Sequence, residues 1–274
     1  MPHSSAPDPD PAPGLVTIGR AAKKASLGGR TQVIVPVSGD AAALSGQVEA
    51  LTLCRADIVE WRADTFLSSL VGSHFVAASD VEEDLVRMAR YVADSSPLPV
   101  LATIRTSVEG GEAYLDDDEY CALVRRLASF AGGVDVEISC DGSSALIDEV
   151  HEAGAIVVAS FHDFEGTPGD EQLAEVLAAM NYAGADVLKF ACMANSATDA
   201  ARVLAAQAWA REAYDRPVIG ISMGEHGAPT RLVGSALGSA ATFATLPGWE
   251  GSAPGQFTVE QVRTVLDITE GAEA

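Results

Sequence analysis

Residues 155–191 read AIVVASFHDFEGTPGDEQLAEVLAAMNYAGADVLKFA. A continuous apolar run begins this stretch at 155–160, apolar residues at helical spacing follow at 170–182, and a second apolar run ends it at 186–191. Strands that are apolar on both faces are typical of a parallel sheet covered by helices. The stretch therefore predicts a strand, a crossover helix and a second, parallel strand.

The same alternation continues on both sides of this unit. Further strand-like runs lie at 32–37, 57–62, 99–105, 134–138, 217–222 and 238–243. Segments with helical spacing lie at 42–54, 79–93, 117–130, 142–153, 198–213, 227–236 and 258–268. Eight strand–helix units over residues 15–274 predict an α/β fold, a single-domain (β/α)8 TIM barrel. An open doubly wound sheet is the alternative, but the G-x-G-x-x-G turn typical of that fold does not follow the first run.

The composition restricts the partners and the location of the chain. Its 39 acidic and 17 basic residues give a net charge of −22, which makes nucleic acid and anionic membranes unfavourable partners. The sequence shows neither an apolar run of about 18 residues nor a signal-peptide pattern. The four cysteines form no C-x-x-C motif and lie in apolar segments, so we expect reduced, buried thiols and a cytoplasmic protein. Residues 1–14, with five prolines, are expected to form a disordered acidic tail.

Charged side chains gather at the predicted carboxyl ends of the strands, where the active sites of barrel enzymes lie. They are Glu60, Arg62, Arg105, Glu109, Asp135, Glu137, His162, Lys189 and Arg231. Alternation along a strand places Glu60 and Arg62 on the same face. Buried ion pairs that merely fill the barrel would explain any one strand, but charges at the same end of six consecutive strands favour a functional site.

Lys189 is the most informative of these residues. The chain has three lysines, and Lys23 and Lys24 precede the first predicted strand and are expected to be solvated. Lys189 instead lies within the apolar run at 186–191. A lysine in apolar surroundings can lose its proton near neutral pH and attack a carbonyl, which arginine cannot do. The alternative is a lysine that reaches from the strand end to water.

His162 is the natural partner of such an amine in proton transfer. Among five histidines, it is the one that directly follows a buried strand run. Glu109, at the exit of the third predicted strand, could orient the imidazole and stabilise its charged form. A hydrogen-bonded structural histidine is the alternative, and Lys189 on the next strand favours the catalytic interpretation.

Other catalytic motifs are incomplete. The G-x-S-x-G pattern at 220–224 is typical of serine hydrolases, but only Glu225 and His226 follow it as an acid and a histidine. There is no H-E-x-x-H motif and no Cys/His cluster for zinc, and no G-x-x-x-x-G-K-[ST] loop for a nucleoside triphosphate. We therefore expect neither a metal nor a cofactor.

Taken in order, these segments resemble the type I 3-dehydroquinate dehydratases, the Schiff-base dehydratases of the shikimate pathway. The matching segments are EWRAD at 60–64, TIRT at 103–106, EGG at 109–111, DVE at 135–137, SFHDF at 160–164, the strand around Lys189, SMG at 222–224, Arg231, GSAATF at 238–243 and SAPGQ at 252–256. The resemblance covers residues 32–268. It implies a (β/α)8 barrel, a homodimer, that removes water from 3-dehydroquinate to give 3-dehydroshikimate in aromatic amino acid biosynthesis.

The resemblance also implies a role for each matching residue. Lys189 forms an imine with the C3 ketone, and His162 takes a proton from C2 and assists loss of the C1 hydroxyl. Glu109 positions His162, and Arg231 binds the substrate carboxylate. The remaining residues bind substrate: Glu60, Arg62 and Arg105 hold the ring hydroxyls, and Ser252 and Gln256 belong to a loop that closes over the ring.

Two other functions fit parts of the same pattern. A class I aldolase would use Lys189 on a different substrate, with Gly224, Gly227 and Gly238 available for a phosphate site. A barrel that merely binds a polyhydroxy acid would be expected to have lost Lys189 or His162, and both are present.

Overall fold

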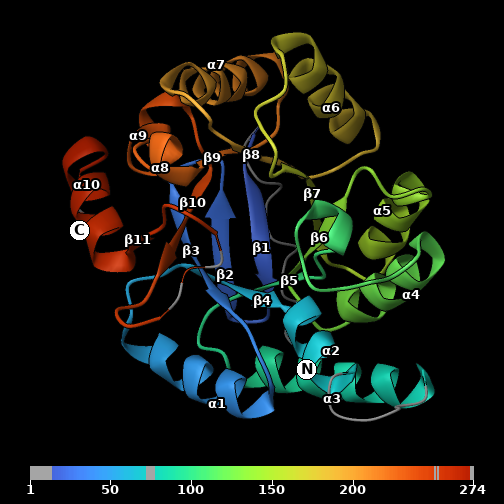
Figure 1. Ribbon diagram of the computed structural model, residues 1–274. Coiled ribbons are helices and arrows are strands. Elements are labelled where there is room, and N and C mark those ends of the chain that lie inside the picture. The colour runs from blue at the N-terminus through green and yellow to red at the C-terminus, as the bar shows by residue number, and fades with distance from the viewer. Residues whose placement is uncertain (1–13, 72–77, 250, 252, 272–274) are drawn as a thin grey trace, which may run out of the picture.

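The computed structural model describes residues 14–71, 78–249, 251 and 253–271, which form a (β/α)8 barrel (Figure 1). Within these residues, eight parallel strands form the wall: β3 (Gln32–Val37), β4 (Ile58–Arg62), β5 (Val100–Thr103), β6 (Gly133–Glu137), β7 (Ile156–Asp163), β8 (Val187–Met193), β9 (Val218–Met223) and β10 (Ala241–Thr245). Neighbours pair in chain order, and a bridge between Val218 and Ser239 joins β9 to the segment before β10 and closes the ring. The predicted barrel is confirmed. The expected tail at 1–14 lies outside the described residues except for Gly14.

Helices surround this wall (Figure 1). The longer ones are α1 (Ala41–Ala50), α3 (Ala78–Ser95), α4 (Asp117–Ala128), α5 (Ser143–Glu152), α6 (Asp170–Tyr182), α7 (Ala197–Ala213) and α10 (Val259–Thr269). A helix that the apolar spacing did not predict, α2 (Ala63–Val71), begins directly after β4. A short strand, β11 (Phe257–Thr258), pairs with β10 at the edge of the sheet.

Local signals explain where several helices begin and where one expected helix breaks. The side chains of Asp40, Asp116, Ser196 and Thr258 each accept a hydrogen bond from a backbone N–H three residues later, which caps α1, α4, α7 and α10. The single helix expected at 227–236 is wrong. Three short elements take its place: α8 (Gly224–Gly227), α9 (Thr230–Val233) and the 3-10 turn η3 (Gly234–Leu237). Pro229, which has no N–H to continue the helix ladder, separates α8 from α9.

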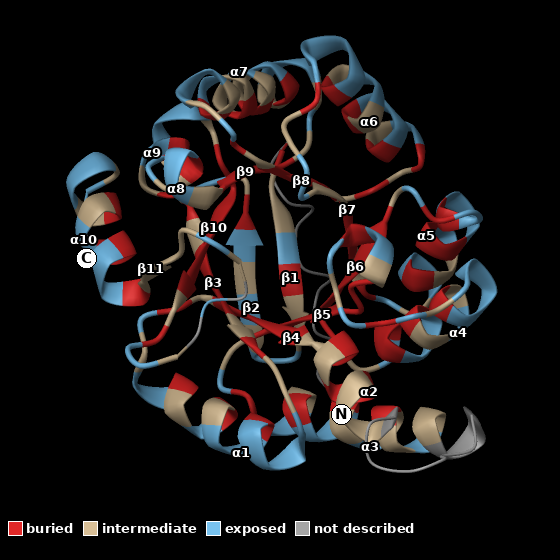
Figure 2. Cartoon of the chain, in the orientation of Figure 1, coloured by how far each residue is buried: buried red, intermediate tan, exposed pale blue. Residues whose placement is uncertain are grey.

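The strands are apolar on both faces because each one contributes to an outer and an inner core. In β8, Leu188 and Phe190 face the outer core beneath the helices, whereas Val187 and Ala191 face the inner core in the barrel lumen. Figure 2 shows the resulting pattern, with buried residues along the strands and on the helix faces that cover them. Lys189 shares the lumen face with Val187 and Ala191, so alternation in β8 directs it into the barrel.

A β-hairpin that the sequence did not predict closes the amino-terminal end of the barrel. Its strands are β1 (Val16–Arg20) and β2 (Lys23–Leu27), which pair antiparallel. Ile18 and Leu27 are 1% exposed and belong to the inner core. Glycine is required where the hairpin meets β6, because a Cβ on Gly132 would lie 2.4 Å from the Cα of Gly19.

The hairpin corrects the expectation that Lys23 is solvated. Its Nζ donates hydrogen bonds to the carbonyl oxygens of Ala93 and Asp94, both at 3.0 Å, at the end of α3, whereas Lys24 is exposed. Lys23 therefore anchors the hairpin to α3.

The cysteine environments differ from one another. All four are free thiols. Cys140 and Cys192 are buried as expected, but Cys54 and Cys121 are only half-buried.

In the part of the chain that the structure describes, no helix has the length and apolar character needed to cross a bilayer.

Candidate active site

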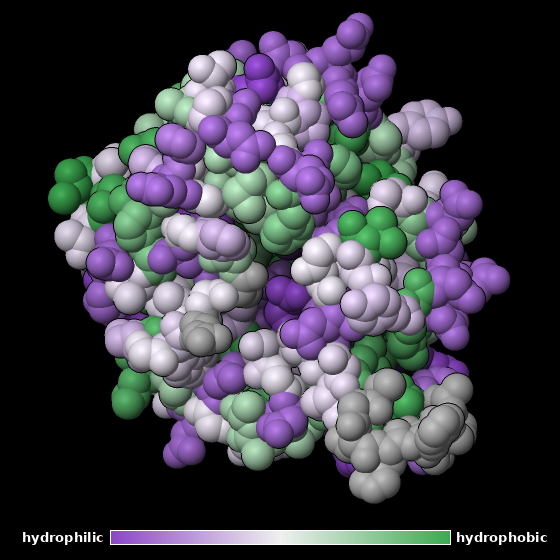
Figure 3. Space-filling model, in the orientation of Figure 1, coloured by the Kyte–Doolittle hydropathy of each residue, from purple (hydrophilic) through white to green (hydrophobic). Residues whose placement is uncertain are grey.

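A pocket opens at the carboxyl ends of the strands, on the face of the barrel opposite the hairpin. Its empty volume is about 580 Å³, including the open solvent at its entrance. Figure 3 shows it as a hollow near the centre of this face, with hydrophilic residues at its base. The lining residues are Glu60, Arg62, Thr103, Arg105, Glu109, Gly110, His162, Phe164, Lys189, Ala191, Ile221, Met223, Arg231, Phe243, Ala253 and Gln256.

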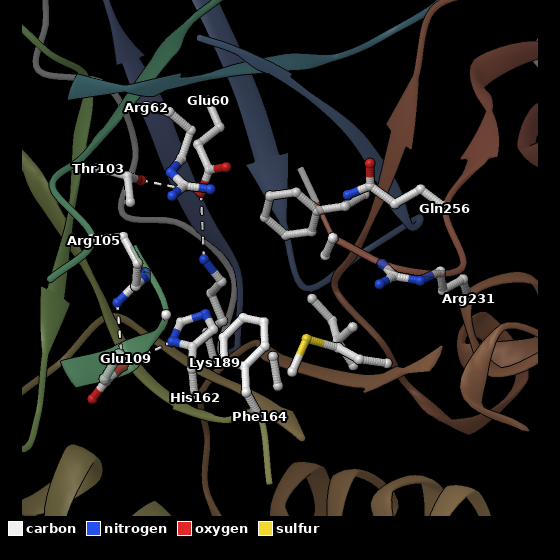
Figure 4. A pocket seen from close by; sticks show the side chains of 16 residues that line it. Glu60, Arg62, Thr103, Arg105, Glu109, His162, Phe164, Lys189, Arg231 and Gln256 are labelled. Carbon is white, nitrogen blue, oxygen red and sulfur yellow. Dashed lines mark hydrogen bonds and ion pairs between the residues drawn. The ribbon is translucent and has the colours of Figure 1, made fainter. Parts of the chain in front are cut away.

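Nine residues received a catalytic or substrate-binding role from the family resemblance, and the structure brings eight of them together in this pocket. Ser252, the ninth, lies outside the described residues. Figure 4 shows Lys189 between two groups, with the His162–Glu109 pair on one side and Arg231 with Gln256 on the other. The strand-end rule thus located the pocket correctly.

Lys189 is buried, but the expectation that apolar groups surround its amine is wrong. The side chain is 3% exposed, and its Nζ lies 2.9 Å from Asp135 Oδ2 and 3.4 Å from Glu60 Oε1. The Phe243 ring lies below it, with the centroid 4.9 Å from Nζ. Two carboxylates and an aromatic face all stabilise an ammonium ion. These contacts hold the amine of Lys189 in a defined orientation in the pocket.

His162 and Glu109 form a hydrogen-bonded pair at the mouth of the barrel. His162 Nδ1 lies 2.8 Å from Glu109 Oε2, and both groups are largely buried. Burial lowers the pKa of His162 well below its usual value, and the positive charges of Arg105 and Lys189 lower it further. Burial also raises the pKa of Glu109 to about 7, against the opposing effect of Arg105. The imidazole is therefore held in its neutral form, as a proton acceptor must be.

Arg105 connects the acidic residues of the site. Its Nη1 lies 2.8 Å from Glu137 Oε1 and 3.3 Å from Glu109 Oε2, and its Nη2 lies 2.8 Å from Asp135 Oδ1. Nη1 also donates to Ser160 Oγ at 3.0 Å. Both terminal nitrogens of Arg105 are thus engaged by neighbouring side chains. A guanidinium presents its donors in a fixed planar fork, so it holds these carboxylates in defined directions, whereas a lysine ammonium is a point charge on a flexible chain.

Asp135 is, with Glu137, one of two acidic residues that the sequence analysis placed at a strand end without a role. It is fully buried and accepts a hydrogen bond from Ser160 Oγ at 2.6 Å. Burial alone would raise the pKa of Asp135, but the charges of Arg105 and Lys189 outweigh it and hold that pKa well below its usual value. Asp135 therefore remains a carboxylate beside the lysine. Its position next to Lys189, on β6 and β8, depends on packing across the lumen.

Glu60 and Arg62 extend from the same face of β4, as alternation predicts. Glu60 Oε1 accepts a hydrogen bond from Thr103 Oγ1 at 3.1 Å. Arg62 forms two bonds with Asp64, from Nε at 2.9 Å and from Nη2 at 2.7 Å. Asp64, at the start of α2, is fully buried and holds the guanidinium over the pocket.

Arg231 and Gln256 form the opposite wall. Arg231 is 5% exposed, and its Nη2 donates to the carbonyl oxygen of Pro254 at 3.2 Å. Its buried Nε has no hydrogen-bond partner among the described residues. Burial lowers the pKa of Arg231 to about 10. A buried guanidinium without a carboxylate partner is suited to receive one from a ligand.

The described residues contain no group of three or more His, Cys, Asp or Glu that could hold a metal ion. Ser222, the centre of the G-x-S-x-G pattern, is fully buried, and its Oγ makes no hydrogen bond within the described ranges. It therefore lacks the histidine that a serine nucleophile requires.

Known proteins share this sequence and this architecture. The family model for type I 3-dehydroquinase matches residues 33–273. A 3-dehydroquinate dehydratase of Klebsiella pneumoniae (strain 342) is 36% identical over 246 residues, which are 88% of this chain and 94% of that protein. One from Aromatoleum aromaticum is 36% identical over 250 residues, 88% of this chain and 91% of that protein.

Solved structures agree with the sequence comparison. The 3-dehydroquinate dehydratase from Geobacillus kaustophilus has a TM-score of 0.84 and 31% identity, and the match covers 96% of this chain and 98% of that one. A type I enzyme from Clostridium difficile, solved with covalently modified comenic acid, has a TM-score of 0.77 and 30% identity, with 93% and 97% covered. Since sequence and fold match over most of its length, the chain belongs to the type I 3-dehydroquinase family.

Proposed function

We propose that this chain converts 3-dehydroquinate to 3-dehydroshikimate through a Schiff base on Lys189, with His162 as the proton-transfer group. The observation that carries the proposal is the shared pocket, in which the buried Lys189 amine and the His162–Glu109 pair face the same space. An imine formed by a lysine is a stronger electron sink than a ketone, so it stabilises the carbanion that proton removal creates.

The covalent steps balance without a cofactor. Lys189 first gives up a proton, for which Asp135 and Glu60 are the acceptors in contact with Nζ. The amine adds to the C3 ketone and a water molecule leaves, which produces the C=N bond. His162 takes the C2 proton, the electron pair moves into the iminium, and the resulting enamine expels the C1 hydroxyl as water with the proton from His162. Hydrolysis of the C=N bond releases the product and restores the lysine.

The surrounding residues orient these two groups. Nδ1 of His162 faces Glu109, so we assign the proton transfer to Nε2. Asp135 and Arg105 keep the charges of the pocket paired and place the lysine amine. Arg62, Glu60 and Arg105 line the side where the ring hydroxyls would bind, and Arg231 takes the substrate carboxylate opposite them. Gln256 and Ser252 are assigned to the loop above the ring.

An Arg231→Lys variant is expected to raise the KM for 3-dehydroquinate by about 10- to 100-fold, because a point ammonium cannot replace a planar guanidinium bound to a carboxylate. Steady-state kinetics would measure this change, with kcat less affected than KM. The exposed Arg87→Lys exchange on α3 is the matched control and should leave both constants unchanged. A normal KM for Arg231→Lys would remove this residue from the carboxylate site.

We also propose that the enzyme is a cytoplasmic homodimer. The location is supported by the four free thiols, because disulfides are typical of oxidising compartments and rare in the cytosol. Light scattering on the purified chain tests the dimer, and a monomer mass at assay concentration would contradict it.

Borohydride trapping tests the proposed chemistry directly. The protein is incubated with 3-dehydroquinate and sodium borohydride, which reduces an imine to a stable secondary amine. Intact mass should rise by one ligand equivalent, and peptide mapping should place the adduct in the segment 186–195. Lys24 is the internal control, because it is exposed and should remain unmodified. An active enzyme that forms no adduct, or forms it at Lys24, would refute the Schiff base.

A further inference from the structure

We propose that Ser139 is a positioning residue that holds the Glu109 carboxylate against His162. The inference rests on the proposed roles of His162 and Glu109. Ser139 Oγ donates a hydrogen bond to Glu109 Oε1 at 2.6 Å, while the other carboxylate oxygen, Oε2, faces His162 Nδ1 at 2.8 Å. Oε1 of Glu109 is therefore bound by Ser139, while Oε2 faces His162 and lies 3.3 Å from Arg105 Nη1. The hydroxyl acts with Arg105 to direct Oε2 toward the imidazole.

The backbone around Ser139 is fixed by the network of the site. Ser139 lies two residues after Glu137, whose carboxylate accepts hydrogen bonds from Thr106 N at 2.8 Å and from Thr106 Oγ1 at 2.7 Å. The next backbone N–H, of Ile138, donates to the Ser160 carbonyl at 2.9 Å. The turn that carries Ser139 is thus tied to the segment after β5 and to β7, so its hydroxyl is presented to Glu109 in a defined place.

The hydrogen bond also affects the charge of Glu109. Burial raises the pKa of Glu109, and the carboxylates of Glu137 and Asp135 raise it as well. The Arg105 guanidinium and the Ser139 hydroxyl oppose them. Since a hydroxyl donor stabilises the ionised carboxylate, losing it would raise the pKa of Glu109 further.

The ionised form of Glu109 is the one that His162 needs. A carboxylate accepts the Nδ1 proton and leaves Nε2 unprotonated, so Nε2 can take a proton from the substrate. A protonated Glu109 could donate to Nδ1, which would move the imidazole proton to Nε2. Activity should therefore fall as the pH falls through the pKa of Glu109, and loss of the Ser139 hydroxyl should move this fall to higher pH.

Two variants with side chains of the same shape, valine and threonine, separate the effect of the hydroxyl from the effect of side-chain shape. Ser139→Val removes the donor and fills its space, whereas Ser139→Thr keeps it. For Ser139→Val we expect the acidic limb of the kcat–pH profile to move up by about one pH unit. KM should stay near the wild-type value, because Ser139 is absent from the pocket lining. Ser139→Thr should restore the wild-type profile, and Ser144→Val, at an exposed position of α5, is the control.

The outcomes distinguish this inference from the proposed function. If the wild-type chain neither turns over 3-dehydroquinate nor forms the trapped adduct, the proposed function is wrong. If the wild type is active and the Val and Thr variants share its pH profile, Ser139 does not position Glu109. Should Ser139→Val fail to fold in thermal denaturation, Ser139→Ala takes its place, and its limb should also move to higher pH. If the acidic limb of the kcat–pH profile of Ser139→Ala stayed at the wild-type pH, the inference would equally be overturned.

Discussion

A Lys189→Arg variant is expected to show no trapped adduct and a loss of turnover greater than about a thousandfold, more than a proton-transfer group alone usually contributes. Arginine keeps the positive charge beside Asp135 and Glu60, so the buried carboxylates remain paired. It cannot form an imine with a ketone, because its guanidinium does not lose a proton in the relevant range. The variant thus removes covalent chemistry while preserving the charge of the pocket.

Mass spectrometry after borohydride reduction would measure the loss of the adduct, and the enone absorbance of the product would measure the loss of turnover. The same exchange at exposed Lys24 is the matched control and should leave turnover unchanged. Thermal denaturation of both variants verifies that they fold. Appreciable turnover by Lys189→Arg would show that the reaction proceeds without a lysine imine.

The second large effect is expected for His162→Ala, which should lower kcat by about 10²- to 10⁴-fold, the usual contribution of a general acid–base group. The imine should still form, because Lys189 keeps its contacts with Asp135 and Glu60. Substrate should therefore accumulate as a covalent adduct that borohydride traps with wild-type stoichiometry. Loss of turnover combined with retained trapping distinguishes a proton-transfer residue from a structural one.

His151→Ala supplies the comparison for this variant. His151 lies at the end of α5 and pairs with Asp186 at 2.8 Å, before β8 begins, so it belongs to the opposite end of the barrel. Its loss should leave kcat within about twofold of the wild type. Turnover by His162→Ala within tenfold of the wild type would exclude His162 as the main base.

The barrel could be predicted because buried parallel strands leave a strong pattern in the sequence. The strands from β3 to β10 are largely apolar on both faces, and β4, β6 and β7 end in the charged or polar residues Arg62, Glu137 and Asp163. The hairpin escaped prediction because β1 (VTIGR) and β2 (KKASL) are short and partly polar, and Ala21 takes the positive φ of the turn where glycine is usual. α2 escaped because it follows β4 without a connecting loop.

The members of the site could be predicted, but their pairings could not. Strand-end position identified Lys189, His162 and Arg105 one by one. Which carboxylate pairs with which cation depends on how β4, β5, β6 and β8 face one another across the lumen. Local sequence does not determine this arrangement. For this reason the sequence suggested an apolar surrounding for Lys189, whereas Asp135 approaches it from a strand more than 50 residues away.

The hairpin determines how molecules enter and leave the catalytic chamber. Together with the inner core it fills the far end of the lumen in the described part of the chain, with Ile18 and Leu27 packed against apolar strand residues. The pocket opens at the other end of the barrel, so we expect substrate and product to pass through the same opening. A new substrate molecule can therefore enter only after the previous product has left through this opening.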